Sequence, residues 1–530
     1  MQRRHFLAAS ALPLIGCHSR NEMRHEIEGG FEGISLERGH LLRDTKTWPA
    51  PTTTQRTRVL IAGGGVAGLA AARALRLRGM NDFVLLELED SAGGNARGTQ
   101  LGGIACPMGA HYLPVPGDDA PQVQDLLEEL GLRRRMSGRW VWEERHLCHS
   151  PQERLFFRGE WQEGMLPLHG VGPQTLAAYR RFSALVEHAR KAARWVIPVT
   201  SVQPSALQLE LDGITFSAWL SQQNLSDAQL LWYLDYCCRD DFGAGLATVS
   251  AWAGIHYFAS RHGFHVPGEG APEREGVFTW PQGNAWLTQR LAAPLQSAGQ
   301  LHTGQIVLRI AESKHGVEID AFNTASQAVE RWQAERCIVA LPLLVAGRVL
   351  QTPDVRIRER AAQIRYAPWL VANVHIAQPL FDRPGAAPSW DNVIYPTGTA
   401  ATLQSLGYVD ATHQSLQRVP GATVLTWYLA LGDAPEGRRR LLEQPWTHWR
   451  DALLADLAVP HPDLHNKVTR VAITRYGHAM AMPTPGTLRH IVPAATLTGG
   501  RLQFAHSDWA GYSVFEEAFA LGQAAGSARF

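Results

Sequence analysis

Short apolar segments bounded by glycines open the folded part of the chain. Residues 57–62, Thr-Arg-Val-Leu-Ile-Ala, predict a buried strand, and glycines follow it at 63–65. Residues 67–78 are rich in alanine, leucine and arginine and predict a helix, with Gly79 placed to end it. Residues 83–86, Phe-Val-Leu-Leu, predict a second buried strand. A strand, a helix and a strand in this order predict a βαβ unit and an α/β fold.

The pattern of apolar positions changes further along the chain. Between about residues 117 and 270 apolar residues recur at helical spacing, which predicts a mainly helical insertion. Strand-like runs return after it, and a closing helix is expected at 516–528. The expected strands cover residues 305–310, 316–319, 337–340, 371–376, 423–429 and 501–505.

The composition excludes several classes of protein. The 530 residues are 45% hydrophobic and 19% charged, which is typical of a packed globular protein rather than a disordered chain. Lysine and arginine (50) nearly balance aspartate and glutamate (49), so no net field favours nucleic acid. The six cysteines form no C-x-x-C pair, so we expect no metal site.

The N-terminus has the pattern of an export signal. Paired arginines, Arg3-Arg4, precede a short apolar stretch at 6–16, and Cys17 follows. Arg-Arg-x-Phe-Leu resembles the twin-arginine signal, and Leu-Ile-Gly-Cys at 14–17 resembles a bacterial lipobox. These resemblances imply export in the folded state, a periplasmic location and lipid attachment at Cys17. The alternative is an ordinary secretory signal in which the cysteine is incidental.

A glycine-rich turn lies between the first predicted strand and helix. Residues 63–68, Gly-Gly-Gly-Val-Ala-Gly, match G-x-G-x-x-G. The first glycine makes the tight turn, the second lets the backbone approach a pyrophosphate, and the third lets helix and strand pack closely. The N-terminal N–H groups of the helix then face the phosphates. The expected dinucleotide contacts in this turn are Gly63, Gly65, Val66, Ala67 and Gly68.

An acidic residue and a second glycine pair follow the second strand. Glu87 lies about 20 residues beyond the turn, where a carboxylate holds both ribose hydroxyls of a dinucleotide. The alternative is a glycine turn with a surface glutamate. Residues 90–97, Asp-Ser-Ala-Gly-Gly-Asn-Ala-Arg, contain the second pair, which NAD binding does not require.

This second pair resembles the GG signature of the large FAD family that includes amine oxidases, protoporphyrinogen oxidase and phytoene desaturases. In that family the glycines let a second loop pass beside the FAD diphosphate, which implies a cofactor contact from Gly94. The family usually has arginine directly after the pair. Here Asn95 stands there, and the resemblance implies the phosphate role for Arg97.

Further segments resemble the same family in the same order. Residues 108–112 resemble the segment that runs past the flavin ring, and 306–307 the strand whose valine meets adenine. Residues 280–284, 339–342 and 504–512 resemble a turn re-entering the FAD domain, the "V-x-A-x-P" segment and the terminal strand with "W-S-G-Y". The implied contacts are Gly109, Ala110, Val307, Asp508, Gly511 and Tyr512.

The catalytic residues match the family less completely. Around 370–381 there is no counterpart of the lysine that many amine oxidases place near flavin N5. One position of the family's aromatic cage falls on Ala479, which leaves Tyr512 as the matched cage residue, with Tyr476 or Trp509 as a substitute. His111 and His478 are candidates for proton transfer. The predicted catalytic residues are therefore Tyr512, His111 and Tyr476.

The resemblance implies a Rossmann-like FAD-binding domain with an inserted mixed α+β substrate domain. The expected parts are an export signal (1–17), an N-terminal arm (18–56), the FAD domain (57–115, 275–350 and 490–530) and the substrate domain (116–274 and 351–489). FAD should be non-covalent, because no cysteine lies near Tyr512 or Tyr476 in the sequence.

The expected function is FAD-dependent oxidation of an exported small molecule, preferably an amine, by hydride transfer to flavin N5. Oxygen or a periplasmic acceptor would reoxidise the flavin. One alternative is dehydrogenation of an apolar substrate, as in desaturases and porphyrinogen oxidases. Another is a non-catalytic flavin-binding lipoprotein. No nucleic-acid partner is expected, and the membrane is expected only through the export signal or the lipid anchor.

Overall fold

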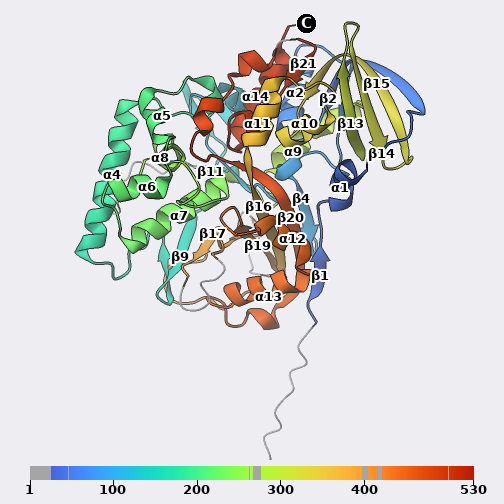
Figure 1. The fold of residues 1–530 in the computed structure, drawn as a ribbon. Helices are drawn as coiled ribbons and strands as arrows, with labels where there is room; N and C mark the ends of the chain where they lie inside the picture. Colours follow the sequence, from blue (N-terminus) through green and yellow to red (C-terminus); the bar gives the residue numbers. More distant parts are fainter. Residues whose placement is uncertain are drawn as a thin grey trace, which may run out of the picture.

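The computed structural model describes most of the chain after the predicted export signal. The described residues are 26–45, 47–261, 263–266, 276–396, 404–413, 415, 421–498 and 500–529. The predicted twin-arginine motif and Cys17 lie outside them. Figure 1 shows a helical lobe, a large sheet below the centre and another sheet, with its covering helices, at the top.

The first sheet joins three distant parts of the sequence. Its strands run in the order β12-β3-β2-β15-β14-β13, and β21 pairs with β15. These strands are β2 (Thr53–Ala62), β3 (Phe83–Leu86), β12 (Leu301–His302), β13 (Gln305–Glu312), β14 (Val317–Asn323), β15 (Ala328–Val339) and β21 (Leu502–Phe504). The core β12-β3-β2-β15-β21 is parallel, and β13 and β14 extend it in antiparallel pairing. The strands predicted for these segments are confirmed.

Two helices pack against each other beside this sheet. They are α2 (Val66–Leu77) and α14 (Phe515–Ser527). A Cβ added to Gly522 would lie 2.1 Å from the carbonyl oxygen of Ala67, and one added to Gly526 would lie 2.3 Å from that of Ala71. The helices therefore approach closely through small residues. This packing brings the chain end beside the glycine-rich turn at residues 63–68.

The second sheet has eight strands in the order β1-β20-β16-β19-β18-β17-β9-β10. They are β1 (Glu28–Phe31), β9 (Glu153–Phe157), β10 (Glu160–Glu163), β16 (Arg365–Ile376), β17 (Asp391–Ile394), β18 (Tyr408–Asp410), β19 (Thr423–Ala430) and β20 (Val468–Met482). The strands predicted at 371–376 and 423–429 are confirmed, and the first is longer than expected because it pairs with β20 along its length.

The described part of the polar segment before residue 56 packs against the rest of the protein. Strand β1 pairs with β20, where Phe31 packs under the Arg475 guanidinium at 3.5 Å. Helix α1 (Leu36–Asp44) follows, and the Ser35 side chain accepts a hydrogen bond from the N–H of Arg38 at its start. We expected only an arm or tether here, because a four-residue strand with two glycines carries little sequence signal.

The helical lobe covers one face of the second sheet. Its helices are α4 (Pro173–Ala192), α5 (Ala206–Leu211), α6 (Phe216–Gln222), α7 (Ala228–Phe242) and α8 (Ala251–Ala259). Their apolar side chains share a core with the sheet residues Trp369, Tyr428 and Tyr476. The predicted helical insertion is thus confirmed, although the same region also contributes β9 and β10.

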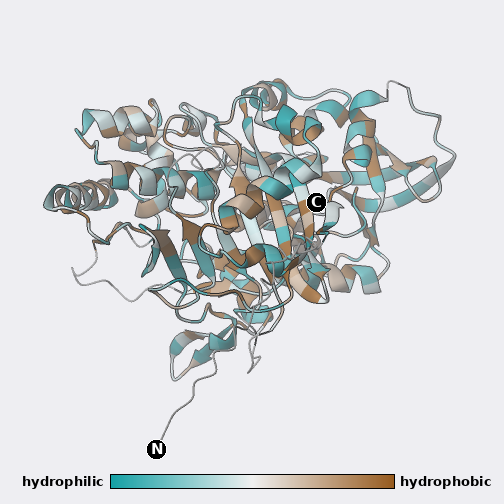
Figure 2. Ribbon diagram, turned by 90° about the horizontal axis from the view of Figure 1, so that it is seen from below, coloured by the Kyte–Doolittle hydropathy of each residue, from teal (hydrophilic) through white to brown (hydrophobic). Residues whose placement is uncertain are grey.

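The remaining elements are three two-stranded pairs, β4–β5, β6–β11 and β7–β8, and helices that pack around the two sheets. They are β4 (Gly98–Leu101), β5 (Ile104–Pro107), β6 (Tyr112–Pro114), β7 (Arg133–Met136), β8 (Arg139–Trp142), β11 (Val277–Thr279), α3 (Pro121–Glu129), α9 (Ala285–Ser297), α10 (Leu343–Val349), α11 (Val355–Gln363), α12 (Gly437–Glu443) and α13 (Trp446–Leu457). Figure 2 shows hydrophobic residues along the central strands, with helices of mixed polarity around them. None of the helices in the described ranges is long and apolar enough to span a bilayer.

Candidate functional site

A cavity of about 500 Å³ joins the first sheet to the second, a volume typical of small-molecule and cofactor sites. At one end it is lined by the turn between β2 and α2, together with Glu87 and Val307. At the other end it is lined by side chains of β16, β19 and α7, including Trp369, Tyr428 and Asp240.

Glycines shape the first end of this cavity. Gly63 has φ +105°, and an added Cβ would lie 2.4 Å from the carbonyl oxygen of Ala340. A Cβ on Gly68 would lie 1.9 Å from the carbonyl oxygen of Gly63, so this position requires glycine for helix–strand packing. Gly65 and Gly94 face each other, and a Cβ on Gly94 would lie 3.2 Å from Cα of Gly65. The two glycine loops therefore form a narrow slot of bare backbone.

Glu87 is fixed at the end of β3 by backbone donors. Its Oε2 accepts from the N–H of Gly64 at 2.8 Å, and its Oε1 accepts from the N–H of Glu89 at 2.9 Å. Burial raises the pKa of this carboxyl, and the two backbone hydrogen bonds partly offset that rise. Each oxygen keeps a free lone pair for a further donor. A vicinal diol at the cavity surface fits this arrangement.

Asp508 lines the cavity beside the start of α10. Its Oδ2 accepts from the N–H of Leu343 at 2.8 Å and from the hydroxyl of Tyr366 at 2.5 Å, and His506 Nδ1 lies 3.2 Å from Oδ1. Burial alone would raise its pKa, but His506 and these hydrogen bonds hold the pKa below its usual value. The carboxylate is thus engaged by protein donors and ties α10 to the last strand.

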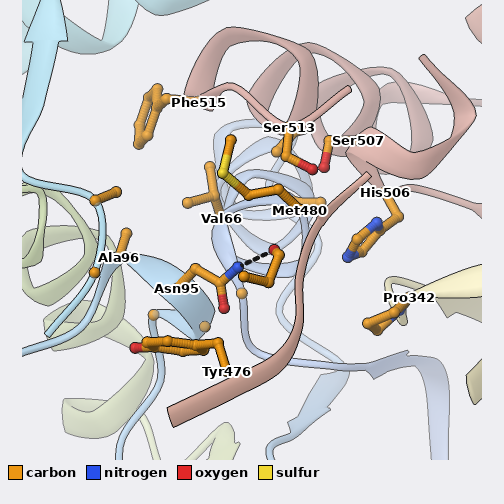
Figure 3. Close-up of a pocket in the computed structure, with 18 of the residues that line it drawn as sticks. Val66, Asn95, Ala96, Pro342, Tyr476, Met480, His506, Ser507, Ser513 and Phe515 are labelled. Atoms are coloured by element: carbon orange, nitrogen blue, oxygen red, sulfur yellow. Dashed lines mark hydrogen bonds between the residues drawn. The ribbon is translucent and has the colours of Figure 1, made fainter. Parts of the chain in front are cut away.

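The middle of the cavity is built by the segment after the second glycine pair. Asn95 donates through Nδ2 to the carbonyl oxygen of Ala479 at 2.6 Å, and its own carbonyl accepts from the N–H of Ala110 at 2.9 Å. Figure 3 shows Asn95 between Tyr476 and Met480, with His506 on another side of the cavity. Asn95, at the position where arginine is usual in the family, therefore joins two loops.

Two tyrosines hold the neighbouring backbone and present their rings to the cavity. The hydroxyl of Tyr476 donates to the carbonyl of Met108 at 2.8 Å, and that of Tyr428 donates to the carbonyl of Gly109 at 2.9 Å. Burial raises the pKa of Tyr476 to about 12. His111 stacks on Tyr428 with ring centroids 4.4 Å apart, and burial lowers its pKa to about 3. This wall is therefore aromatic and uncharged at neutral pH.

Charged residues appear where α7 meets the cavity. Asp241 and Arg261 form an ion pair with N–O distances of 2.9 and 3.2 Å. Asp240 lines the same wall and accepts a hydrogen bond from the hydroxyl of Tyr112 at 3.4 Å. Burial raises the pKa of Asp240 to about 7, and the adjacent Asp241 adds to the rise.

Most of the residues predicted from the sequence lie on the cavity wall. They are Gly63, Gly65, Val66, Ala67, Glu87, Gly94, Gly109, Ala110, His111, Val307, Tyr476 and Asp508. Four others lie behind the wall in the described structure: Gly68, Arg97, Gly511 and Tyr512.

The structure places Tyr512 away from the wall. Its ring is fully buried against Phe242, Trp252 and His256, at centroid distances of 6.0, 6.3 and 5.6 Å. Helix α14 begins at Phe515, three residues later, so the residues just before the helix line the cavity in its place. The geometry gives Tyr512 a packing contact where the resemblance implied a cage residue.

Arg97 also differs from its implied phosphate role. Its Nε donates to the carbonyl of Gly94 at 3.3 Å, and Nη1 lies 3.6 Å from Glu89. It therefore supports the second glycine loop from behind. Asn373, near the expected lysine position, is buried and donates to the carbonyl of Pro107 at 2.9 Å. This hydrogen bond joins β16 to β5.

Sequence reasoning missed several wall residues. They are Tyr112, Asp240, Asp241, Arg261, Trp369, Tyr428 and Phe515. The adjacent acids at the end of a strongly apolar helix offered one usable signal, because such residues are rarely buried without a role. Tyr112, Trp369 and Tyr428 come from strands, whereas Phe515 begins α14 and Arg261 lies in the turn after α8. Whether these side chains face the cavity is set only by tertiary packing.

The cavity residues fit a flavin dinucleotide. Gly65 and Gly94 lie in contact and expose bare backbone along which a diphosphate can lie, and Glu87 keeps free acceptor sites beside it. The aromatic wall around Asn95 and Tyr476 suits a flat ring system. The two ends lie in one continuous space, as a dinucleotide requires.

Comparisons with known proteins agree with this fit. The model of the family "flavin containing amine oxidoreductase" matches residues 66–527. Protoporphyrinogen oxidase 2 of Arabidopsis thaliana is 37% identical over 78 residues, and the match covers 15% of each chain. Protein anon-37Cs of Drosophila melanogaster is 30% identical over 82 residues, and the match covers 16% of each chain. These relatives are thus matched over a small part of their length.

Solved structures share the fold over nearly the whole chain. A putrescine oxidase bound to putrescine is 18% identical, with a TM-score of 0.63 over 89% of this chain and 99% of the other. Cyclohexylamine oxidase from Brevibacterium oxydans IH-35A is 17% identical, with a TM-score of 0.62 over 89% and 98%. At these identities the likeness supports the fold alone. The predicted fold class is confirmed, and the chain belongs to the flavin containing amine oxidoreductase family.

Proposed function

We propose that the protein binds FAD non-covalently and oxidises an amine. The observation that carries this proposal is the continuous cavity, which leads from the dinucleotide slot at Gly65 to a chamber of aromatic rings with a carboxylate, Asp240, on its wall. Two proteins that share this fold are amine oxidases, which makes an amine the first substrate class to test. Bound flavin supplies the two-electron acceptor.

The residues of the chain bind, orient and shield the reactants. Glu87 would hold the ribose and the facing glycines the diphosphate, while Asn95 and Tyr476 flank the ring system. The aromatic wall excludes water and aligns a neutral amine beside the flavin. His111 stays unprotonated at neutral pH because burial lowers its pKa to about 3, so it adds no positive charge to this chamber.

An anaerobic titration tests the proposal. Purified yellow protein is mixed with a panel of primary amines and, separately, with apolar compounds that have activated C–H bonds, and flavin absorbance near 450 nm is followed. Bleaching by amines is the expected result. Bleaching by apolar compounds alone would favour desaturase-like chemistry, and no bleaching by either would favour a non-catalytic flavoprotein.

The flavin is expected to leave the protein on denaturation. None of the described residues that line the cavity is a cysteine, and the three histidines on the wall are His111, His478 and His506. Acid precipitation should therefore release FAD into the supernatant and leave a colourless pellet. Flavin retained on the pellet would contradict non-covalent binding and indicate one of these histidines as the attachment point.

We also propose that the enzyme works in the periplasm, where oxygen or a periplasmic acceptor takes its electrons. The support is the sequence of residues 1–17. A pathway that exports folded proteins would carry FAD inserted in the cytoplasm. Replacing Arg3-Arg4 by Lys-Lys should leave flavin-loaded precursor in the cytoplasm, as measured by fractionation. Normal export of the double variant with FAD would contradict the twin-arginine assignment.

A further inference from the structure

Asp240 presents a carboxylate to the cavity that the described protein residues leave poorly satisfied. It lies near the end of α7 and keeps part of its surface accessible, whereas its neighbour Asp241 is 6% exposed. Its one side-chain hydrogen bond comes from the hydroxyl of Tyr112 at a long 3.4 Å. A carboxylate offers about four acceptor positions, so most of its capacity faces the cavity.

The nearby cations are engaged elsewhere. Arg261 donates to both oxygens of Asp241 and to the carbonyl of Tyr257 at 3.2 Å. Arg239 pairs with Asp235 at 2.8 Å and donates to a backbone carbonyl. Each arginine is therefore balanced by its own aspartate. When Asp240 is ionised, it therefore has no cationic partner among the described residues, and this favours a positively charged group on the ligand.

The reacting amine is unsuited to this position. An amine must be neutral to release hydride, and a carboxylate beside it would stabilise the protonated form. Asp240 lies on α7 and contacts Tyr112, whereas Gly94 and Asn95 belong to the second glycine loop. A group of the substrate other than the reacting nitrogen is therefore the one suited to this carboxylate.

We propose that Asp240 binds a second, cationic group of the substrate, so that the enzyme selects amines with two basic nitrogens. This inference rests on the proposed amine oxidation. Tyr112, Trp369 and Tyr428 would line the apolar spacer between the two nitrogens. Asp240 would position the substrate and set its specificity, while the electrons leave at the other end.

The pH dependence of binding follows from the surroundings of Asp240. The groups that face it are Asp241 and Arg239 on its own helix, and Arg261, Tyr112 and Asp391 on others. Burial and Asp241 raise its pKa to about 7, so the carboxylate forms as the pH rises through 7. An alkylammonium group remains charged there. Affinity for the second nitrogen should therefore increase from pH 6 to pH 8.

Equilibrium binding of matched ligands tests this inference. Short α,ω-diaminoalkanes and n-alkylamines of the same length are titrated anaerobically into the FAD-loaded protein, and binding is followed by thermal stabilisation as well as by flavin bleaching. The diamines should bind the wild type about 10- to 100-fold more tightly, as expected for one charge-assisted pair. Asp240→Asn should bring the ratio close to one.

Asp391→Asn is the matched control. Asp391 lies on β17 and is electrostatically coupled to Asp240, but it does not line the cavity. This variant should keep both the preference for diamines and its pH dependence, because burial and Asp240 hold the pKa of Asp391 well above its usual value and the residue is neutral as Asp240 ionises. If Asp240→Asn fails to fold, the rise of the diamine preference from pH 6 to pH 8 in the wild type tests the inference.

The outcomes separate this inference from the proposed function. If no amine bleaches the flavin, the proposed function is wrong. If amines bleach it but diamines and monoamines bind equally well to the wild type, the role of Asp240 is wrong and amine oxidation stands. A preference for diamines that survives in Asp240→Asn would also overturn the assignment.

Discussion

Replacing Gly65 by valine is expected to give a folded but colourless protein. Gly65 has φ −70°, which any residue adopts, and the nearest atom to an added Cβ is Cα of Gly94 at 3.9 Å. The added Cβ therefore makes only an ordinary van der Waals contact, but the valine side chain covers the bare backbone that the two glycine loops present to the diphosphate. FAD affinity should fall about 100-fold or more, with the thermal unfolding midpoint of the apoprotein little changed.

Two further glycine variants serve as controls for Gly65→Val. Gly68→Val should lose both flavin and stability, because its Cβ would overlap the carbonyl oxygen of Gly63 at 1.9 Å. Gly39→Ala on α1 should keep the flavin and should not lower stability, since no atom lies within 4 Å of its Cβ and alanine favours a helix. Flavin content and apoprotein melting are measured for all three. A Gly65→Val protein that retains FAD at the wild-type level would contradict the assignment of the slot.

The nucleotide end of the site could be predicted because its signals are local. The turn at residues 63–68 must lie between a strand and a helix, and the strand pattern of 83–86 fixes where Glu87 ends up. Backbone geometry then determines what each glycine does. The contacts of Gly63 and Gly68 agree with the roles that the motif assigns to these positions.

The substrate end could not be predicted in the same way. Whether Tyr512 faces the cavity depends on where α14 begins, and a start at Phe515 puts other residues on the wall. Asp240 becomes significant only because Tyr112 and Arg261 pack near it from distant segments. Motif spacing does not contain such contacts, since they depend on how the helical lobe packs on the second sheet.

Asp508 could be predicted from the sequence only in part. Its place on the wall follows from the terminal strand, but the chemical use of its carboxylate does not. The N–H of Leu343 and the hydroxyl of Tyr366 belong to segments more than a hundred residues earlier. Both donate to Oδ2 of the carboxylate for which the resemblance implied a cofactor contact. This network leads to a test of stability.

Asp508→Ala is expected to destabilise the protein by about 3 kcal/mol at pH 7. The carboxylate is 1% exposed, and its removal leaves the buried N–H of Leu343 and hydroxyl of Tyr366 without their acceptor. Urea unfolding of variant and wild type at equal FAD saturation measures the loss. Asp44→Asn, at an exposed ion pair with Arg43, is the control and should leave stability nearly unchanged.

The loss should depend on pH in one direction. The folded-state pKa of Asp508 is held below the ordinary aspartate value, so its contribution is complete above about pH 4 and declines as the pH falls through the folded pKa. The wild type should therefore lose stability on acidification more steeply than Asp508→Ala, and the difference between the two unfolding midpoints should shrink as the pH falls below about 4. A difference that stays constant from pH 7 to pH 3 would show that the ionised carboxylate is not what stabilises this junction.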